Sequence, residues 1–153
     1  MLIEKTKLSN LLNEFWDWFG YSKENYAEMS RQFDPGEFMF PKWSELLEVT
    51  VVLILLDPED DQTIDDMLTV MALDNESEIV LDDIVSYASN ELVHRIIERG
   101  VSHMQHEARW QIAEILLRRK PENALAVLDA LALDEDSSVR QRAQNAIDWF
   151  SES

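Results

Sequence analysis

The chain has 153 residues, 46% of them hydrophobic, and carries a formal net charge of −18 at pH 7. This length and hydrophobic content suit one domain, residues 1–153, and exclude wholesale disorder. The absence of cysteine excludes disulfides and thiolate chemistry, and three glycines with four prolines leave few turn residues for an all-β fold. We therefore expect an all-α domain, and a reducing, cytoplasmic setting fits the lack of cysteine.

The sequence predicts neither a secretory signal nor a membrane-spanning helix. The N-terminal stretch MLIEKTKLSNLLNEF has no apolar core followed by a small-residue cleavage site, so we do not expect a secretory signal. The longest apolar run, VTVVLILL at 49–56, has eight residues, whereas a spanning helix needs about 20. We expect no membrane partner.

Apolar residues at helical spacing recur along the whole chain, between residues that favour helix ends. The expected helices span 7–19, 22–32, 41–56, 63–73, 76–88, 90–99, 102–119, 121–133 and 137–150. The third is rich in β-branched residues, so a strand is its rival, but its length favours a buried central helix. The expected N-caps are Thr63, Asn75, Ser102 and Ser137, and the expected stops include Gly20 and Gly100.

One phrase occurs twice in the sequence. MALDNESEIV at 71–80 and LALDEDSSVR at 131–140 both place a polar turn between two expected helices, with Ile79 and Val139 starting the inner face of the second helix. A more divergent copy has Ala108-Arg109 in the place of Val139-Arg140. The spacings are 29 and 31 residues, and helix pairs at a period near 30 are typical of an α-solenoid.

The segments DEDSSVRQRAQNAI at 134–147 and, more loosely, HEARWQIAEILLRR at 106–119 resemble the second-helix signature of HEAT-type repeats. The resemblance covers about 61–150 and implies a short HEAT-like solenoid of stacked helix pairs over 41–153, with residues 1–40 as an N-terminal helical cap. It further implies that Asp136 with Arg140, and Glu107 with Arg109, form hydrogen-bonded ladders between repeats. Such repeats indicate a fold rather than a function.

The excess negative charge belongs to the middle third. From Trp43 to His94 there are 14 acidic residues and no Lys or Arg, whereas 1–42 and 95–153 each carry a net charge of −2. Carboxylates at helix N-termini explain one or two acids per helix, but not the absence of cations, since like charges repel. The candidate partner-binding residues are Asp57, Glu59, Asp60, Asp61, Asp65, Asp66, Asp74, Glu76, Glu78, Asp82 and Asp83. Trp16, which does not fit the apolar stripe of its helix, is added as a possible interface anchor.

Other site chemistries are poorly matched. The alternating acids at 57–61 lack the glycine of a calcium loop, and His103 with His106 lack a third strong zinc ligand. The arginines of the C-terminal repeats are interleaved with acids, which disfavours phosphate binding. No nucleophile motif or phosphate loop is present. We expect no metal, no cofactor, no nucleic acid and no enzymatic activity.

The expected function is an acidic protein-binding module. Its specific form is an immunity- or antitoxin-like inhibitor that covers the active site of a basic bacterial toxin, a nuclease above all, since acidic fields attract and occupy basic ones. One alternative is a HEAT-type adaptor for another basic protein. A second is a HEAT-like DNA-acting enzyme, which the charge disfavours.

Overall fold

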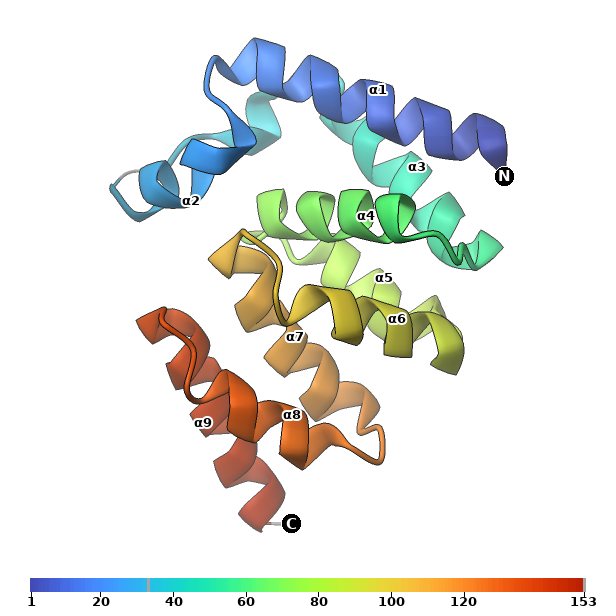
Figure 1. Cartoon of the computed structure of the whole chain (residues 1–153). Coiled ribbons are helices and arrows are strands. Elements are labelled where there is room, and N and C mark those ends of the chain that lie inside the picture. Colours follow the sequence, from blue (N-terminus) through green and yellow to red (C-terminus); the bar gives the residue numbers. More distant parts are fainter. Residues whose placement is uncertain (33, 153) are drawn as a thin grey trace.

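The structure, a computed structural model, describes residues 1–32 and 34–152 (Figure 1). Within these ranges all regular secondary structure is helical, so the expected all-α class is confirmed and residues 43–56 are a helix and not a strand. The helices are α1 (Leu2–Phe19), α2 (Lys23–Gln32), η1 (Glu37–Met39, a 3₁₀ turn), α3 (Trp43–Leu56), α4 (Asp61–Leu73), α5 (Ile79–Tyr87), α6 (Asn90–Gly100), α7 (His106–Arg119), α8 (Ala124–Leu131) and α9 (Ser137–Glu152).

The chain adds its helices in one direction, so that the N- and C-termini lie at opposite ends of the molecule (Figure 1). Helices α3, α5, α7 and α9 contact one another in sequence order. Helices α4, α6 and α8 lie on the other side of this row, and α4 contacts both α6 and α7 (Figure 1). Helix α1 lies across α3 and α4 at the N-terminal end. No described helix is both long and apolar enough to cross a bilayer.

One continuous hydrophobic core runs between the two sides. At the N-terminal end it holds the fully buried rings of Phe15 and Tyr26, and at the C-terminal end Val139 and Ala143. Helix α3 is less central than expected, because Leu55 on its outer side is 63% exposed. Burial of aliphatic side chains along the whole row provides the main stabilisation, at about 25 cal/mol per Å² of apolar surface.

Several helix starts lie away from the expected caps. Helix α4 begins at Asp61 because the Asp60 carboxylate accepts a hydrogen bond from the Thr63 amide at 3.0 Å, so Asp60 and not Thr63 is the N-cap. Helix α9 does begin at Ser137, but the acceptor for its free amides is Asp136, which binds the Val139 amide at 3.1 Å. An aspartate competes well for this position because its carboxylate is favoured by the helix dipole.

The other two expected caps are wrong as well. Helix α5 starts at Ile79, after Glu78 in a left-handed conformation with φ of 57°, and not after Asn75. Helix α7 starts at His106, and its N-cap Gln105 makes no side-chain capping bond. A capping box is therefore not used at either start, although its sequence pattern is present at both.

Gly20 and Gly100 were both expected to end helices, but they have different roles in the structure. Gly20, with φ of 84°, ends α1 in the left-handed conformation that glycine adopts most easily. Gly100 is instead the last residue of α6, with Val101 as the C-cap. A Cβ at Gly100 would lie 2.4 Å from Ile112 Cδ1 and 3.2 Å from Leu68 Cδ2. Gly100 therefore permits the close approach of α6 to α7.

The two copies of the repeated phrase differ in register. Val139 is fully buried, as expected, but in the earlier copy the buried residue is Val80, and Ile79 is 45% exposed. The preceding helices differ too, because Leu73 is buried whereas the equivalent Leu133 is 85% exposed. The assignment of Ile79 to the inner face is therefore wrong by one residue. Helix α5 starts at Ile79 itself, whereas α9 starts at Ser137, two residues before the equivalent Val139.

Candidate protein-binding surface

Most of the acids before and within the first half of α4 are paired with cations from other helices, and Asp66 is the exception among them. Arg99 of α6 binds Asp65 through two nitrogens, at 3.0 and 2.6 Å, and lies 3.5 Å from Asp61. Arg95, one turn earlier on α6, lies 3.6 Å from both Asp57 and Glu59. Two arginines outside the cation-free stretch thus compensate four of its carboxylates. These pairs are partly exposed, so each contributes little stability, but together they reduce the local field.

Asp60 has a structural role. Its carboxylate caps α4 and forms an ion pair with the Lys5 ammonium of α1 at 2.5 Å. Although partial burial opposes ionisation, these contacts with Lys5 and Thr63 lower the pKa of Asp60 to about 2. Asp60 therefore ties α1 to the start of α4. Asp66 of α4 accepts a hydrogen bond from Gln62 at 2.9 Å but has no ion pair with a described residue, and burial raises the pKa of Asp66.

The acids of the α4–α5 turn are different. Asp74 is 2% exposed, and its Oδ2 accepts a hydrogen bond from the Val80 amide at 3.0 Å, which satisfies the start of α5. Burial raises the pKa of Asp74 to about 6. Glu76 is exposed and Glu78 half-buried. Among the described residues no cation lies within ion-pair distance of Asp74, Glu76 or Glu78, so this turn keeps its negative charge.

The two candidate acids of α5, Asp82 and Asp83, differ in whether a cation neutralises them. Asp82 forms an ion pair with Arg118 of α7 at 2.9 Å. Asp83 has no ion pair with any described residue, and burial together with the charge of Asp82 raises its pKa. The candidate acids without an ion pair to a described residue thus lie in the α4–α5 turn and at Asp66 and Asp83, so the set does not form one uniform surface.

A further buried acid faces the α4–α5 turn and was missed from the sequence. Glu37 of η1 is 5% exposed and accepts a hydrogen bond from the Tyr26 hydroxyl. Asn75 donates to the same Tyr26 oxygen at 3.2 Å and to the Ala72 carbonyl at 2.8 Å. Burial raises the pKa of Glu37 and of Tyr26. No local pattern distinguishes Glu37 from a surface acid, because the residues that contact its carboxylate, Tyr26 of α2 and Asn75 of the α4–α5 turn, are distant in the chain.

The expectation that Trp16 lies apart from the core side of α1 is wrong. Trp16 is half-buried, with its ring centroid 5.0 Å from Phe15 and 6.0 Å from Tyr26. Helix α2 folds back against this side of α1 and covers it. Of the two tryptophans of α1, Trp18 is the more exposed, at 42%. Nothing in the periodicity of α1 indicates that a later helix covers its second side.

The start of α7 is polar but buried. Glu107 is 3% exposed and accepts a hydrogen bond from Ser30 of α2, and burial raises the pKa of Glu107 to about 7. His106 is also buried, which lowers its pKa. His103 accepts a hydrogen bond from the Gln105 amide at 3.0 Å. The contacts of α2 with this region are made by Ser30 with Glu107 and by the Lys23 carbonyl with Gln105, and the described residues contain no cluster that could hold a metal ion.

The arginine ladders differ from those that the resemblance implies. Arg109 is 7% exposed and binds Asp134 of the next turn through two nitrogens, at 2.9 and 3.2 Å. Arg140 donates to the backbone carbonyl of Asp134 at 2.8 Å. Asp136 caps α9 and pairs with Arg31 of α2 instead of Arg140. Arg109 does link its turn to the next, but its partner is Asp134 and not Glu107.

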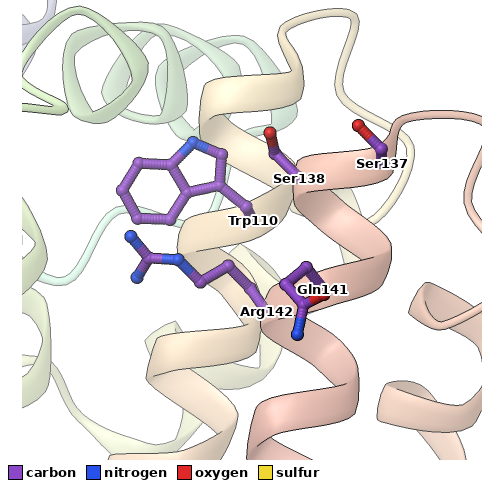
Figure 2. A pocket seen from close by; sticks show the side chains of 5 residues that line it. All are labelled: Trp110, Ser137, Ser138, Gln141 and Arg142. Carbon is purple, nitrogen blue, oxygen red and sulfur yellow. The ribbon is translucent and has the colours of Figure 1, made fainter.

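An open recess of about 460 Å³ lies between α7 and α9 (Figure 2). Figure 2 shows the indole of Trp110 beside the guanidinium of Arg142, with Ser137 and Ser138 at the start of α9. The guanidinium carbon of Arg142 lies 4.3 Å from the Trp110 ring centroid, and Arg142 also pairs with Glu114 at 2.9 Å. Because this arginine is already neutralised, the recess offers no free positive charge.

Comparisons with protein families, with curated proteins and with solved structures found no match.

Proposed function

We propose that the protein is a non-catalytic binding module for a basic protein. The observation that carries this proposal is the uncompensated charge of the α4–α5 turn. Where acids lie near α6 or α1, the fold supplies Arg95, Arg99 or Lys5, but Glu76 and Glu78 receive no cation from the described residues. Uncompensated like charge destabilises a fold and is useful when a partner neutralises it.

The proposed scaffold is a short HEAT-like stack. It is supported by the row of contacts from α3 through α5 and α7 to α9, and by the buried pair of Arg109 with Asp134 between successive turns. Residues 1–40 are proposed as the N-terminal cap, since α1 lies across α3 and α4. Such stacks present an extended surface on which loops and turns of one side line up.

The specific form that we favour is an immunity-like inhibitor acting in the cytoplasm. A nuclease holds phosphate with positive charge, and a small acidic protein that associates with this charge blocks the substrate. An adaptor for another basic protein uses the same surface. The two forms differ in one observable, because only an inhibitor abolishes a catalytic activity of its partner.

The arrangement of the arginines supports the exclusion of nucleic acid. Arg118 and Arg142 pair with Asp82 and Glu114, and Arg119 donates to the Ala88 carbonyl at 2.7 Å. A DNA-binding surface needs free cations whose field survives salt. We therefore expect no binding to duplex DNA at about 150 mM salt, and such binding would favour the DNA-acting alternative.

The decisive experiment compares two charge-reversed variants in affinity capture. Glu76→Lys with Glu78→Lys removes the uncompensated acids, and Glu135→Lys with Glu122→Lys, at exposed positions beside α8, makes the same change in net charge elsewhere. A basic protein retained by the wild type and the control, lost by the turn variant, and bound more slowly at high salt supports the proposal. Equal capture by both variants contradicts it.

A further inference from the structure

The start of α1 and the ends of α3 and α5 meet at one corner of the molecule. Lys5, near the start of α1, pairs with Asp60 just after α3 at 2.5 Å. The Ser89 hydroxyl, just after α5, donates a hydrogen bond to the carboxylate of Asp57, the C-cap of α3, at 2.8 Å. In Figure 1 the ends of α1 and α3 lie on the side of the view that is marked N. Side chains at these three helix ends therefore belong to one region.

Large apolar side chains are open to solvent in this region, which we call the α1–α3–α5 corner. Each of them is at least 39% exposed, and they are Leu2, Ile3, Val52, Leu55, Leu56 and Tyr87. Single exposed apolar side chains are ordinary on a protein surface, but a group of them at one place marks an interaction site. The corner is therefore a candidate docking surface.

Helix α3 has the composition of a helix that is covered on all sides. Its second half, VTVVLILL at 49–56, is apolar at every position except Thr50. A helix that is apolar all round is usually buried all round. Helices α1, α4 and α5 pack against α3, but Leu55 remains 63% exposed and Val52 remains 41% exposed. A partner that covers this side would remove their apolar surface from water.

The charges on the α3 and α5 side of the corner are negative. Glu48 lies on the same side of α3 as Val52 and Leu55, because positions i, i+4 and i+7 of a helix lie in line. Asp83 precedes Tyr87 by one turn of α5. Neither acid forms an ion pair with a described residue. The surface is thus complementary to apolar side chains that are flanked by cations.

The same charges disfavour two other occupants. A second copy of the chain would bring acids against acids in a protein whose net charge is −18, and an anionic lipid surface would be repelled in the same way. On the α1 side the neighbouring recess is balanced in charge, with two lysines and two glutamates: Lys7, Lys42, Glu14 and Glu45. No part of the corner therefore attracts an acidic surface strongly.

We propose that the α1–α3–α5 corner binds an amphipathic helix of the basic partner. Apolar side chains of this helix contact Val52, Leu55 and Tyr87, and its lysine or arginine side chains pair with Glu48 and Asp83. A helix fits because α3 presents a straight ridge of side chains, and helices pack by fitting such ridges into grooves.

The proposal rests on the proposed function, because the helix belongs to the same basic protein, but it concerns a second surface. Helix α5 joins the two surfaces, since it starts at the α4–α5 turn and ends at the corner. Its nine residues rise roughly 13 Å at about 1.5 Å per residue. One partner can therefore contact the acids of the turn and the apolar corner together.

The probe is a synthetic peptide of leucine and lysine, about 14 residues long, whose leucines repeat at helical spacing. Fluorescence anisotropy of the labelled peptide should show saturable binding to the full chain. Leu55→Gln with Tyr87→Gln should weaken this binding about tenfold or more, because a few well-covered side chains dominate the affinity of an interface. Both side chains are more than half exposed, so the variant should fold, and its melting curve checks this.

The matched control is Leu125→Gln with Leu133→Gln, which changes two exposed leucines towards the other end of the molecule. It should bind the peptide as the wild type does. A peptide of the same composition in scrambled order, without an apolar stripe, should bind weakly and equally to all three proteins. Equal affinities of the two double variants, or tight binding of the scrambled peptide, would overturn the proposal.

Two further measurements test the other occupants. A dimer of the wild type in analytical ultracentrifugation that Leu55→Gln with Tyr87→Gln abolishes means that a second copy covers the corner. Binding to phosphatidylcholine vesicles that the same variant abolishes means that lipid covers it. Either result overturns the proposed occupant.

Affinity capture separates this proposal from the proposed function. A basic protein that the variant of the α4–α5 turn loses, but that Leu55→Gln with Tyr87→Gln retains at full affinity, refutes the corner while the binding module stands. If the peptide binds the corner but no basic protein is captured, the corner is supported and the proposed function fails on its own.

Discussion

Replacement of Gly100 by alanine tests whether this glycine is needed for close packing or for ending a helix. Gly100 has a helical conformation, so alanine alone would improve helix propensity by about 1 kcal/mol. Its Cβ, however, would lie 2.4 and 2.6 Å from two carbons of the fully buried Ile112, and 3.2 Å from Leu68. Overpacking costs about 1–3 kcal/mol, and these overlaps place it near 3. We expect a net loss of about 2 kcal/mol in unfolding free energy.

The assay is urea unfolding followed by circular dichroism and extrapolated to zero denaturant. Ile112→Val removes the Cδ1 atom that lies nearest to the new Cβ and should by itself cost about 0.5–1.5 kcal/mol. The double variant Gly100→Ala/Ile112→Val should be more stable than the sum of the two losses implies, with a coupling energy of at least about 1 kcal/mol.

Gly20→Ala is the control, because Gly20 has φ of 84° and no atom within 4 Å of the added Cβ. It should cost about 1 kcal/mol through its left-handed backbone alone and show no coupling to Ile112→Val. If Gly100→Ala is neutral or stabilising, or if Ile112→Val does not relieve it, the close approach of α6 and α7 does not explain the glycine.

Three further predictions concern charged side chains. Arg109→Met leaves the carboxylate of Asp134 nearly buried and unpaired, and should cost about 3–5 kcal/mol in urea unfolding, against at most about 1 kcal/mol for Arg118→Ala at an exposed pair. Burial raises the pKa of Glu107 to about 7, so the fold loses stability as pH rises from 4.5, the ordinary pKa of a glutamate, through 7. Glu107→Gln should remove up to about 3 kcal/mol of that loss in pH-dependent melting. The lowered pKa of Asp60 has the opposite effect on the pH dependence of stability. Asp60→Ala should cost about 1 kcal/mol of unfolding free energy near pH 6, and this difference from the wild type should shrink as pH falls towards 2. A difference that stays constant with pH would contradict the assigned contacts.

The sequence predicted helix positions well where apolar periodicity carried the information. Ala108 and Val139, aligned as equivalent starts of two inner faces, are both fully buried, and Ile112 and Ala143 one turn later are buried too. Helix ends were predicted less well, because several polar residues near each turn can accept the same free amides. At the start of α4 both Asp60 and Thr63 have suitable side chains, and only the backbone geometry selects Asp60.

The candidate site was predicted only in part, for an electrostatic reason. The absence of Lys and Arg from Trp43 to His94 is real, but a carboxylate responds to distance in space and not along the chain. Arg99 reaches back 34 residues to Asp65, whereas Glu76 receives no such partner from the described residues. The same stretch therefore contains neutralised acids and uncompensated ones, and the sequence pattern cannot separate them.

The sequence by itself determined the helical class, the order of the helices and the strong negative charge, because these depend on composition and on the local period of apolar residues. Only the tertiary structure decided which polar groups are buried and which charges are neutralised. Helix α2 buries Glu107 and Trp16, and α6 carries Arg95 and Arg99 to the acids of α4. Burial and Coulomb energy depend on neighbours that are distant in the chain, and so they follow from the packing of helices and not from any one segment.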